Sequence, residues 1–175
     1  MKTFADHLTQ YAAYHRDSRN IATHFVGIPM IVVALAILFA RPSIELLGMP
    51  VSPACLLVAG TLIFYFRLNL VFALLFTVIY GATWFLAQYL AAQSTVVWLS
   101  WGLGLFVVGW VLQFIGHYYE GKKPAFVDDI VGLFVGPLFV AAEIAFALGL
   151  CPELRATIEA RVGPVRTGLG TAKVA

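Results

Sequence analysis

Residues 25–40 read FVGIPMIVVALAILFA and contain no charged side chain. The whole chain is 61% hydrophobic and only 11% charged, with a mean hydropathy of +0.90, whereas soluble domains carry about 25% charged residues. Further apolar runs of up to about 20 residues indicate helices that cross a membrane. The alternating pattern of an outer-membrane barrel is absent. The sequence therefore predicts an all-α, multi-span transmembrane helix bundle.

About five spans are expected within a single integral-membrane domain, residues 1–151. They are placed at about residues 25–40, 51–66, 70–90, 95–116 and 130–150. Pro29 is expected in the first turn of the first span, where proline is tolerated. Residues 152–175 are polar and rich in Gly, Thr and Ala, so we expect them to form a flexible tail.

The first 24 residues are expected to form an interfacial helix followed by a polar motif. Residues 3–16 have an amphipathic pattern typical of a helix that lies in the headgroup plane. A break is expected at residues 17–20, with Ser18 and Asn20 as candidate N-caps of the next helix. Because nine residues turn one continuous helix by about half a revolution, only such a break lets His15 and His24 face a common site.

Counting the crossings places the two polar stretches of the chain at the same membrane surface. Basic residues are concentrated on that side, which the positive-inside rule makes cytoplasmic: they are Lys2, Arg16, Arg19, Arg67, Lys122 and Lys123. The basic tail would fall on the other side of the membrane after five crossings. Either its charges lie too far along the chain to affect the orientation, or the segment with Pro137 does not cross the membrane fully. No Lys/Arg-rich run indicates a nucleic-acid partner.

The two polar stretches suggest a metal site. His15 and His24 lie in the first, and His117 and Glu120 lie three residues apart on one helix face in the second. Imidazole together with carboxylate suits non-haem Fe(II), and also Zn or Mn. We therefore predict His15, His24, His117 and Glu120 as ligands, and we expect the fourth histidine, His7, to be solvated. Glu120 could instead form a solvated surface ion pair with a nearby lysine or arginine.

Other polar residues are candidates for supporting roles. Tyr11, Asn20 and Gln113 are suited to fixing the orientation of the imidazoles. Glu143 falls within the fifth predicted span, where an acidic residue costs about 2–3 kcal/mol, so it should face inward with a partner. It could serve the site or a substrate channel, or it could only make an interhelical hydrogen bond.

Two spaced motifs carry a family resemblance. They are Tyr11-x3-His15-x4-Asn20-x3-His24-x2-Gly27-x-Pro29 and Gln113-x2-Gly116-His117-x2-Glu120-x3-Pro124-Ala125. With the later Gly136-Pro137 and Glu143, the pair resembles the membrane 2-hydroxy-fatty-acid dioxygenase family, known from fungal fatty-acid α-oxidation. The resemblance covers about residues 7–150.

This resemblance implies an Fe(II)-dependent dioxygenase that uses O2 to shorten a 2-hydroxy fatty acid by one carbon. The implied iron ligands are His15, His24 and His117, with Glu120 as a ligand or a nearby base. Glu120, Tyr11 and Asn20 are then the candidate catalytic residues, and Lys122 is a candidate for steering the substrate carboxylate. The protein would be a multi-pass protein of a bacterial inner membrane, or of the endoplasmic reticulum in a eukaryote, with its site on the cytoplasmic side.

Two other classes of function remain open at this point. A bis-histidine haem protein could use His24 and His117 as axial ligands. A lipid-binding or transport protein would not need the histidines at all. Four histidines are too few for the di-iron centre of the membrane desaturases. The sequence leaves open the chain length and stereochemistry of the substrate, the number of metal ions, and the oligomeric state.

Overall fold

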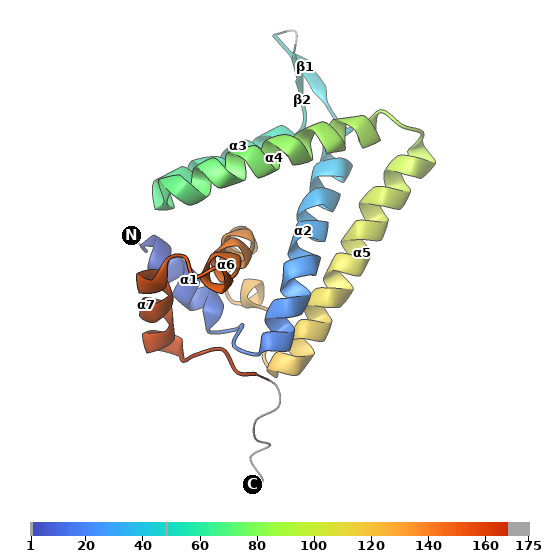
Figure 1. Ribbon diagram of the computed structural model, residues 1–175. Coiled ribbons are helices and arrows are strands. Elements are labelled where there is room, and N and C mark those ends of the chain that lie inside the picture. Colours follow the sequence, from blue (N-terminus) through green and yellow to red (C-terminus); the bar gives the residue numbers. More distant parts are fainter. Residues whose placement is uncertain (1, 48, 168–175) are drawn as a thin grey trace. The chain divides into compact units, whose positions relative to one another are not determined.

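The computed structural model describes residues 2–47 and 49–167 (Figure 1). The described chain is almost entirely helical, which confirms the all-α prediction, and one small hairpin is the exception. The chain forms two compact units. The first joins the two ends of the chain, Met1–Ile28 and Val111–Ala175, and the second is Pro29–Trp110. The single domain of residues 1–151 stays a prediction.

Three of the described helices are long and apolar enough to cross a membrane: α2 (Ser18–Ala40), α4 (Leu70–Ala91) and α5 (Thr95–Glu120). α3 (Pro53–Leu68) is apolar but has only 16 residues. α6 (Gly132–Ala147) and α7 (Pro152–Val162) qualify only together, as a pair bent by 113°. The described chain thus offers three spans, or four with the bent pair, rather than about five.

The second unit holds the predicted second and third spans. α3 packs against α4, and Asn69 is the only residue between them. The Asn69 side chain accepts a hydrogen bond from the Phe72 amide at 3.1 Å and so caps α4. A two-stranded antiparallel hairpin of β1 (Ile44–Leu46) and β2 (Met49–Val51) lies between α2 and α3 in the sequence.

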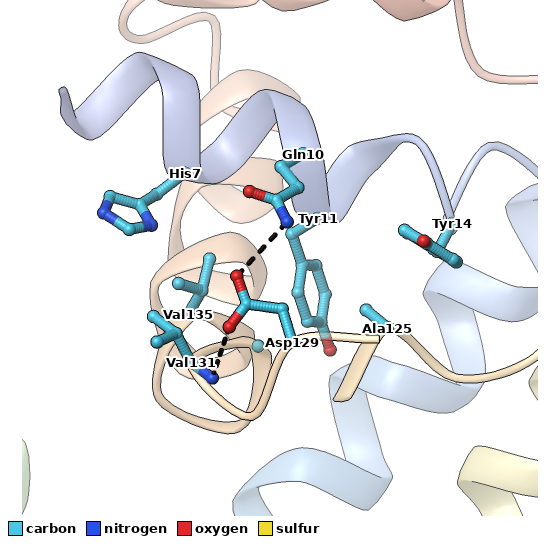
Figure 2. Close-up of a pocket in the computed structure, with 9 residues that line it drawn as sticks. His7, Gln10, Tyr11, Tyr14, Ala125, Asp129, Val131 and Val135 are labelled. Atoms are coloured by element: carbon cyan, nitrogen blue, oxygen red, sulfur yellow. Dashed lines mark hydrogen bonds between the residues drawn. The ribbon is translucent and has the colours of Figure 1, made fainter. Parts of the chain in front are cut away.

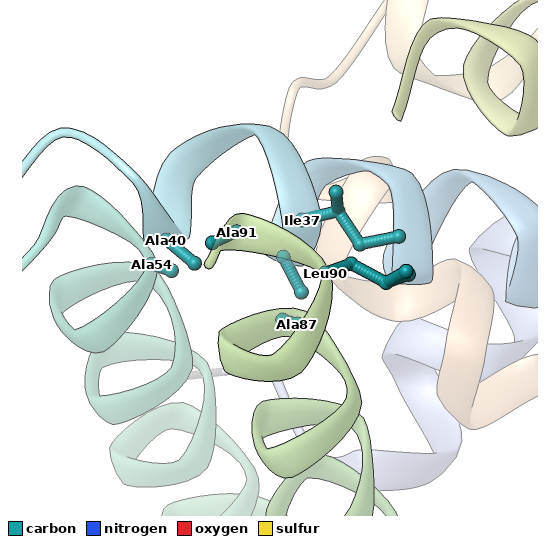
Figure 3. Close-up of a cluster of buried hydrophobic side chains, with 7 residues drawn as sticks. Ile37, Ala40, Ala54, Ala87, Leu90 and Ala91 are labelled. Carbon is teal, nitrogen blue, oxygen red and sulfur yellow. The ribbon is translucent and has the colours of Figure 1, made fainter. Parts of the chain in front are cut away.

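Small side chains allow the helices of the second unit to approach closely. A buried cluster joins the end of α2 to the start of α3 and the end of α4 (Figure 3), and its members are Ala36, Ile37, Ala40, Ala54, Ala87, Leu90 and Ala91. In addition, the Trp98 indole donates a hydrogen bond at 2.8 Å to the Ile37 carbonyl. Alanine dominates this cluster, so the contact rests on close backbone approach more than on large side chains.

The first unit begins with α1 (Phe4–Ala12), which is shorter than the predicted helix of residues 3–16. Thr3 caps it through a capping box with Asp6. α1 packs against α6 and α7, and Leu8 and Ala12 are fully buried. Its apolar face is therefore covered by protein. The position of this helix in the headgroup plane of a membrane stays a prediction.

The break between α1 and α2 is present, but its cap differs from the prediction. Residues 13–17 separate the helices, and α2 begins at Ser18. Asp17, rather than Ser18 or Asn20, caps α2, because its carboxylate accepts the Arg19 amide at 2.9 Å. Pro29 lies inside α2 instead of in its first turn, because this helix starts seven residues before the expected span.

The tail after residue 151 is ordered as far as the structure describes it, which corrects the prediction of a flexible segment. α7 packs on α1, and its Ile158 is 2% exposed. Beyond α7, Arg166 pairs with Asp17 as an isolated parallel β-bridge. Residues 168–175 of the predicted tail lie outside the described residues.

The Asn69 cap gives a test of this fold. Asn69→Ala removes the acceptor for the Phe72 amide and should lower the free energy of unfolding by about 1 kcal/mol. Asn69→Asp keeps an acceptor and should retain most of that stability. Thermal unfolding in detergent measures both variants, and equal losses in the two would contradict a capping role.

Candidate metal centre

The structure brings together three of the four histidines. His15 lies in the segment after α1, His24 in the second turn of α2 and His117 in the last turn of α5. Their ring centroids are 4.4, 4.9 and 5.1 Å apart, and all three residues are buried. Each offers a ring nitrogen, and these atoms lie within 4.8 Å of one another. We call these three residues the histidine cluster.

The hydrogen bonds of two rings fix their tautomers. His15 Nδ1 lies 2.7 Å from the Tyr11 carbonyl, and His24 Nδ1 lies 2.9 Å from the Asn20 carbonyl. A carbonyl oxygen can only accept, so each Nδ1 carries the proton and donates it. The two Nε2 atoms then both present lone pairs, although they face each other at 3.0 Å. Two acceptors at this distance repel unless a cation lies between them.

A metal ion satisfies this arrangement better than an extra proton. Burial, and then the neighbouring His24, lower the pKa of His15 well below its ordinary value, so the ring stays neutral. A neutral imidazole is the form that binds metals. Nitrogens that share one ion at about 2.0–2.1 Å each are expected at about this separation. The residues present therefore fit a metal.

His117 adds a third nitrogen to the cluster. Among the described residues its buried Nδ1 makes no hydrogen bond of good geometry, although the Lys122 backbone acts on the ring. An unpaired polar atom in a dry site is costly, and such an atom requires an explanation such as a missing ion. The unpaired nitrogen supports His117 as a ligand.

Glu120 lies beside the histidine cluster but is fully engaged elsewhere. One of its oxygens, Oε2, accepts the backbone amides of Arg16 at 2.9 Å and Asp17 at 2.7 Å, and the Asn20 side chain at 3.1 Å. The other oxygen, Oε1, accepts from the Arg166 guanidinium at 2.7 Å. The side chain is 0% exposed, so it is no solvated surface pair. Its oxygens are not among the atoms that lie within 4.8 Å of one another in the histidine cluster.

Arg16 forms a second buried contact next to His15. Its guanidinium pairs with Glu143 of α6 at 3.1 Å, and it also donates to the carbonyls of Ala12 and His15 at 3.0 and 2.9 Å. Glu143 thus has the partner that its apolar surroundings demand. Truncating either member would leave a buried charge unpaired. The pair ties the residue after His15 to α6.

Tyr11 and Asn20 both hold the histidines in place. The Tyr11 ring stacks on His15 with centroids 4.1 Å apart and planes 6° apart. The backbone carbonyl of Tyr11 accepts the hydrogen bond from His15 Nδ1. Burial raises the pKa of Tyr11, so the phenol remains protonated. Asn20 supplies a carbonyl to His24 and an amide to Glu120. These contacts fix the orientation of the two imidazoles. The roles predicted for Tyr11 and Asn20 at a metal stay predictions.

The remaining predicted residues lie in different settings. Gln113 is buried one turn before His117 on α5, and its Nε2 has no hydrogen-bond partner among the described residues. Lys122 is exposed and donates to the Ala13 carbonyl at 2.7 Å. His7 lies outside the histidine cluster and lines a small pocket where Gln10 bonds Asp129 at 3.2 Å (Figure 2).

The structural roles of Arg16, Asp17 and Arg166 were not predicted from the sequence. Arg16 and Asp17 read as ordinary surface charges, yet both are buried. The only signal was their position directly after His15, which does not distinguish a buried charge from a solvated one. Arg166 falls in the predicted tail, and its contact with Glu120 spans 46 residues.

The fold and the site together define a helical protein with membrane-type helices and a buried three-histidine centre. The chain belongs to the family described as 2-hydroxy-palmitic acid dioxygenase Mpo1-like, whose model matches residues 1–148. A curated relative from Saccharomyces cerevisiae, 2-hydroxy-palmitic acid dioxygenase MPO1, is 33% identical over 153 residues, which is 85% of this chain and 83% of that protein. No solved structure matches the chain. The predicted family is thus confirmed.

Gly116 gives a test of the packing beside the centre. A methyl group there would clash with the side chains of Thr23 and Asn20 and approach the Asn20 Cα at 3.3 Å. Gly116→Ala should therefore destabilise the protein by about 1–3 kcal/mol and displace Asn20 from His24 and Glu120.

The matched control is Gly104→Ala on the same helix, where a methyl group would meet nothing within 4 Å. It should be neutral or stabilising by up to about 1 kcal/mol, because alanine favours a helix. Thermal unfolding and metal content are measured for both variants. Equal behaviour of the two would contradict the close approach at Gly116.

Proposed function

We propose that this protein is an Fe(II)-dependent dioxygenase that cleaves a 2-hydroxy fatty acid to the acid one carbon shorter. The histidine cluster is the observation that carries the proposal, because its nitrogens converge in a buried site on the residues that the family motifs mark. The activity for which the yeast relative is named supports the same substrate class. The helices with membrane character suit an acyl substrate that partitions into a bilayer.

The overall reaction balances without an added reductant. R–CH(OH)–COOH and O2 give R–COOH, CO2 and H2O, so the bond between the carboxyl carbon and the hydroxyl-bearing carbon breaks. The substrate loses four electrons and O2 gains four. Iron(II), when bound, supplies the redox chemistry and the open coordination positions that hold a 2-hydroxy acid and O2 together.

The chain's own residues prepare the site for this chemistry. The backbone carbonyls of Tyr11 and Asn20 accept hydrogen bonds from Nδ1 of His15 and His24. The Nε2 atoms of both rings therefore face the middle of the histidine cluster. Burial of the cluster excludes water that would compete with substrate. Glu120 fixes the segment between the two histidines and acts as a positioning residue, since both of its oxygens are occupied. The site on the cytoplasmic side of the membrane stays a prediction.

The packing of the cluster disfavours the haem alternative. Axial histidines lie on opposite faces of a planar macrocycle. Here His24 and His117 have ring centroids 5.1 Å apart, and His15 lies within 5 Å of both. A porphyrin would have to displace the third ring.

Metal content tests the proposal directly. The purified protein, reconstituted anaerobically with Fe(II), should hold near-stoichiometric iron without a Soret band. His15→Ala, His24→Ala and His117→Ala should each lose iron and the O2-dependent shortening of 2-hydroxypalmitic acid. Mass spectrometry of the acid product and metal analysis are the measurements.

His7→Ala is the matched control, because His7 is the histidine outside the cluster, and it should retain iron and activity. A Soret band would favour haem instead. Full activity in the three cluster variants would contradict the ligand assignment and leave a lipid-binding or transport role.

Gln113 gives a test of substrate contact. Its buried Nε2 is a donor with no described partner, one turn from His117, and we expect it to donate to an oxygen of the bound acid. Gln113→Leu should raise KM for the 2-hydroxy acid about tenfold or more, as loss of a hydrogen bond to a charged group does, while iron content stays unchanged. Steady-state kinetics with metal analysis measures this, and loss of iron would instead place Gln113 among the residues that support the centre.

A further inference from the structure

The segment that follows α7 contacts Glu120 and the residues that directly follow His15. Residues 163–167, which we call the strap, begin at Gly163, whose φ of +83° turns the chain out of the helix. The family model matches residues 1–148, so the strap lies beyond the matched part.

Backbone hydrogen bonds join the strap to the segment between α1 and α2. The Arg166 amide donates to the Arg16 carbonyl at 2.6 Å, and the Ser18 amide donates to the Arg166 carbonyl at 3.0 Å. Together they form the parallel bridge opposite Asp17. The Gly163 carbonyl also accepts from the Arg16 guanidinium at 3.3 Å. The strap thus holds the residues that directly follow His15.

The Arg166 side chain also acts on this segment, through Glu120. It donates to Glu120 Oε1 at 2.7 Å, while Glu120 Oε2 accepts the amides of Arg16 and Asp17. The backbone amides of residues 16–18 are therefore all bonded either to Glu120 or to the strap. This segment connects His15 to the helix that carries His24. Its conformation decides whether the two nitrogens face each other.

We propose that the strap is a positioning element of the metal centre, in which Arg166 and its backbone lock the segment from Arg16 to Ser18 and so hold His15 against His24. The described contacts of Arg166 are with Glu120 and with the segment from Arg16 to Ser18, so it acts on the histidine cluster through them. Outer partners of metal ligands commonly change affinity by about 10- to 100-fold. Loss of the strap contacts should weaken metal binding by that order and loosen the segment.

A graded set of full-length variants tests this. Arg166→Lys keeps a cation for Glu120, Arg166→Ala removes it, and Arg166→Pro also removes the backbone donor to Arg16. Metal affinity, measured by chelator competition with Fe(II) or with Co(II) as a spectroscopic probe, should fall in that order. Deuterium exchange at residues 13–19 of the metal-free protein should rise in the same order.

Arg161→Ala is the matched control. Arg161 is 52% exposed and bonds Asp6 at 2.7 Å, much as Arg166 is 60% exposed and bonds Glu120 at 2.7 Å. A merely structural role of the C-terminal region would make the two alanine variants alike. The proposal requires Arg161→Ala to keep the wild-type metal affinity and the wild-type deuterium exchange. It also requires Arg166→Lys to retain a higher metal affinity than Arg166→Ala.

The two readouts separate this inference from the proposed function, on which the affinity measurement rests. If the wild-type protein binds no metal, the proposed function fails, and deuterium exchange alone still decides whether the strap locks the segment. Unchanged exchange and affinity in Arg166→Pro, or an equal loss in Arg161→Ala, would overturn the strap proposal.

Discussion

The buried carboxylate of Glu120 is the contact on which the arrangement of the first unit depends. A buried carboxylate needs hydrogen-bond donors for both oxygens, and here four donors from three chain segments supply them. Two of these donors are backbone amides of the segment between α1 and α2. Because Glu120 lies one turn after His117, the same carboxylate that gathers this segment also brings it to the third histidine.

The exit from α1 solves a geometric problem for the histidines. A continuous helix would point His15 and His24 in opposite directions, and the break removes this constraint but leaves several backbone groups unpaired. Glu120 and Arg166 pair them, and Asp17 caps the new helix. Polar residues that look redundant in the sequence therefore share one task, which is to make a break in the chain rigid enough to present ligands.

Hydrophobic patterns and residue spacing predicted most of the helices, but they did not predict the role of every residue in the candidate site. The apolar runs predicted the helices α2 to α5, although α2 starts seven residues earlier than expected and α3 is shorter than the other three, and the histidine spacing correctly required a break before His24. The predicted fifth span, residues 130–150, is only a 16-residue helix in the structure, because α6 ends at Ala147 and the chain turns at Gly149 and Cys151, which both have a positive φ. Of these two residues only the glycine could be recognised in the sequence as a site for such a turn. The pairing of Arg16 with Glu143 and of Arg166 with Glu120 could not be predicted, since such contacts span 46 residues or more and leave no periodic pattern.

The charge balance of the centre bears on the substrate of the proposed enzyme. Three neutral imidazoles would leave a bound divalent ion with its full charge, and Glu120 would not reduce that charge by ligation because its oxygens already accept hydrogen bonds from Arg166 and the backbone. In a buried site of low dielectric an uncompensated double charge is strongly unfavourable. An anion must then complete the site, and a 2-hydroxy carboxylate brings both a negative charge and a second oxygen. A centre of this composition favours an acidic substrate before any contact with its acyl chain is made.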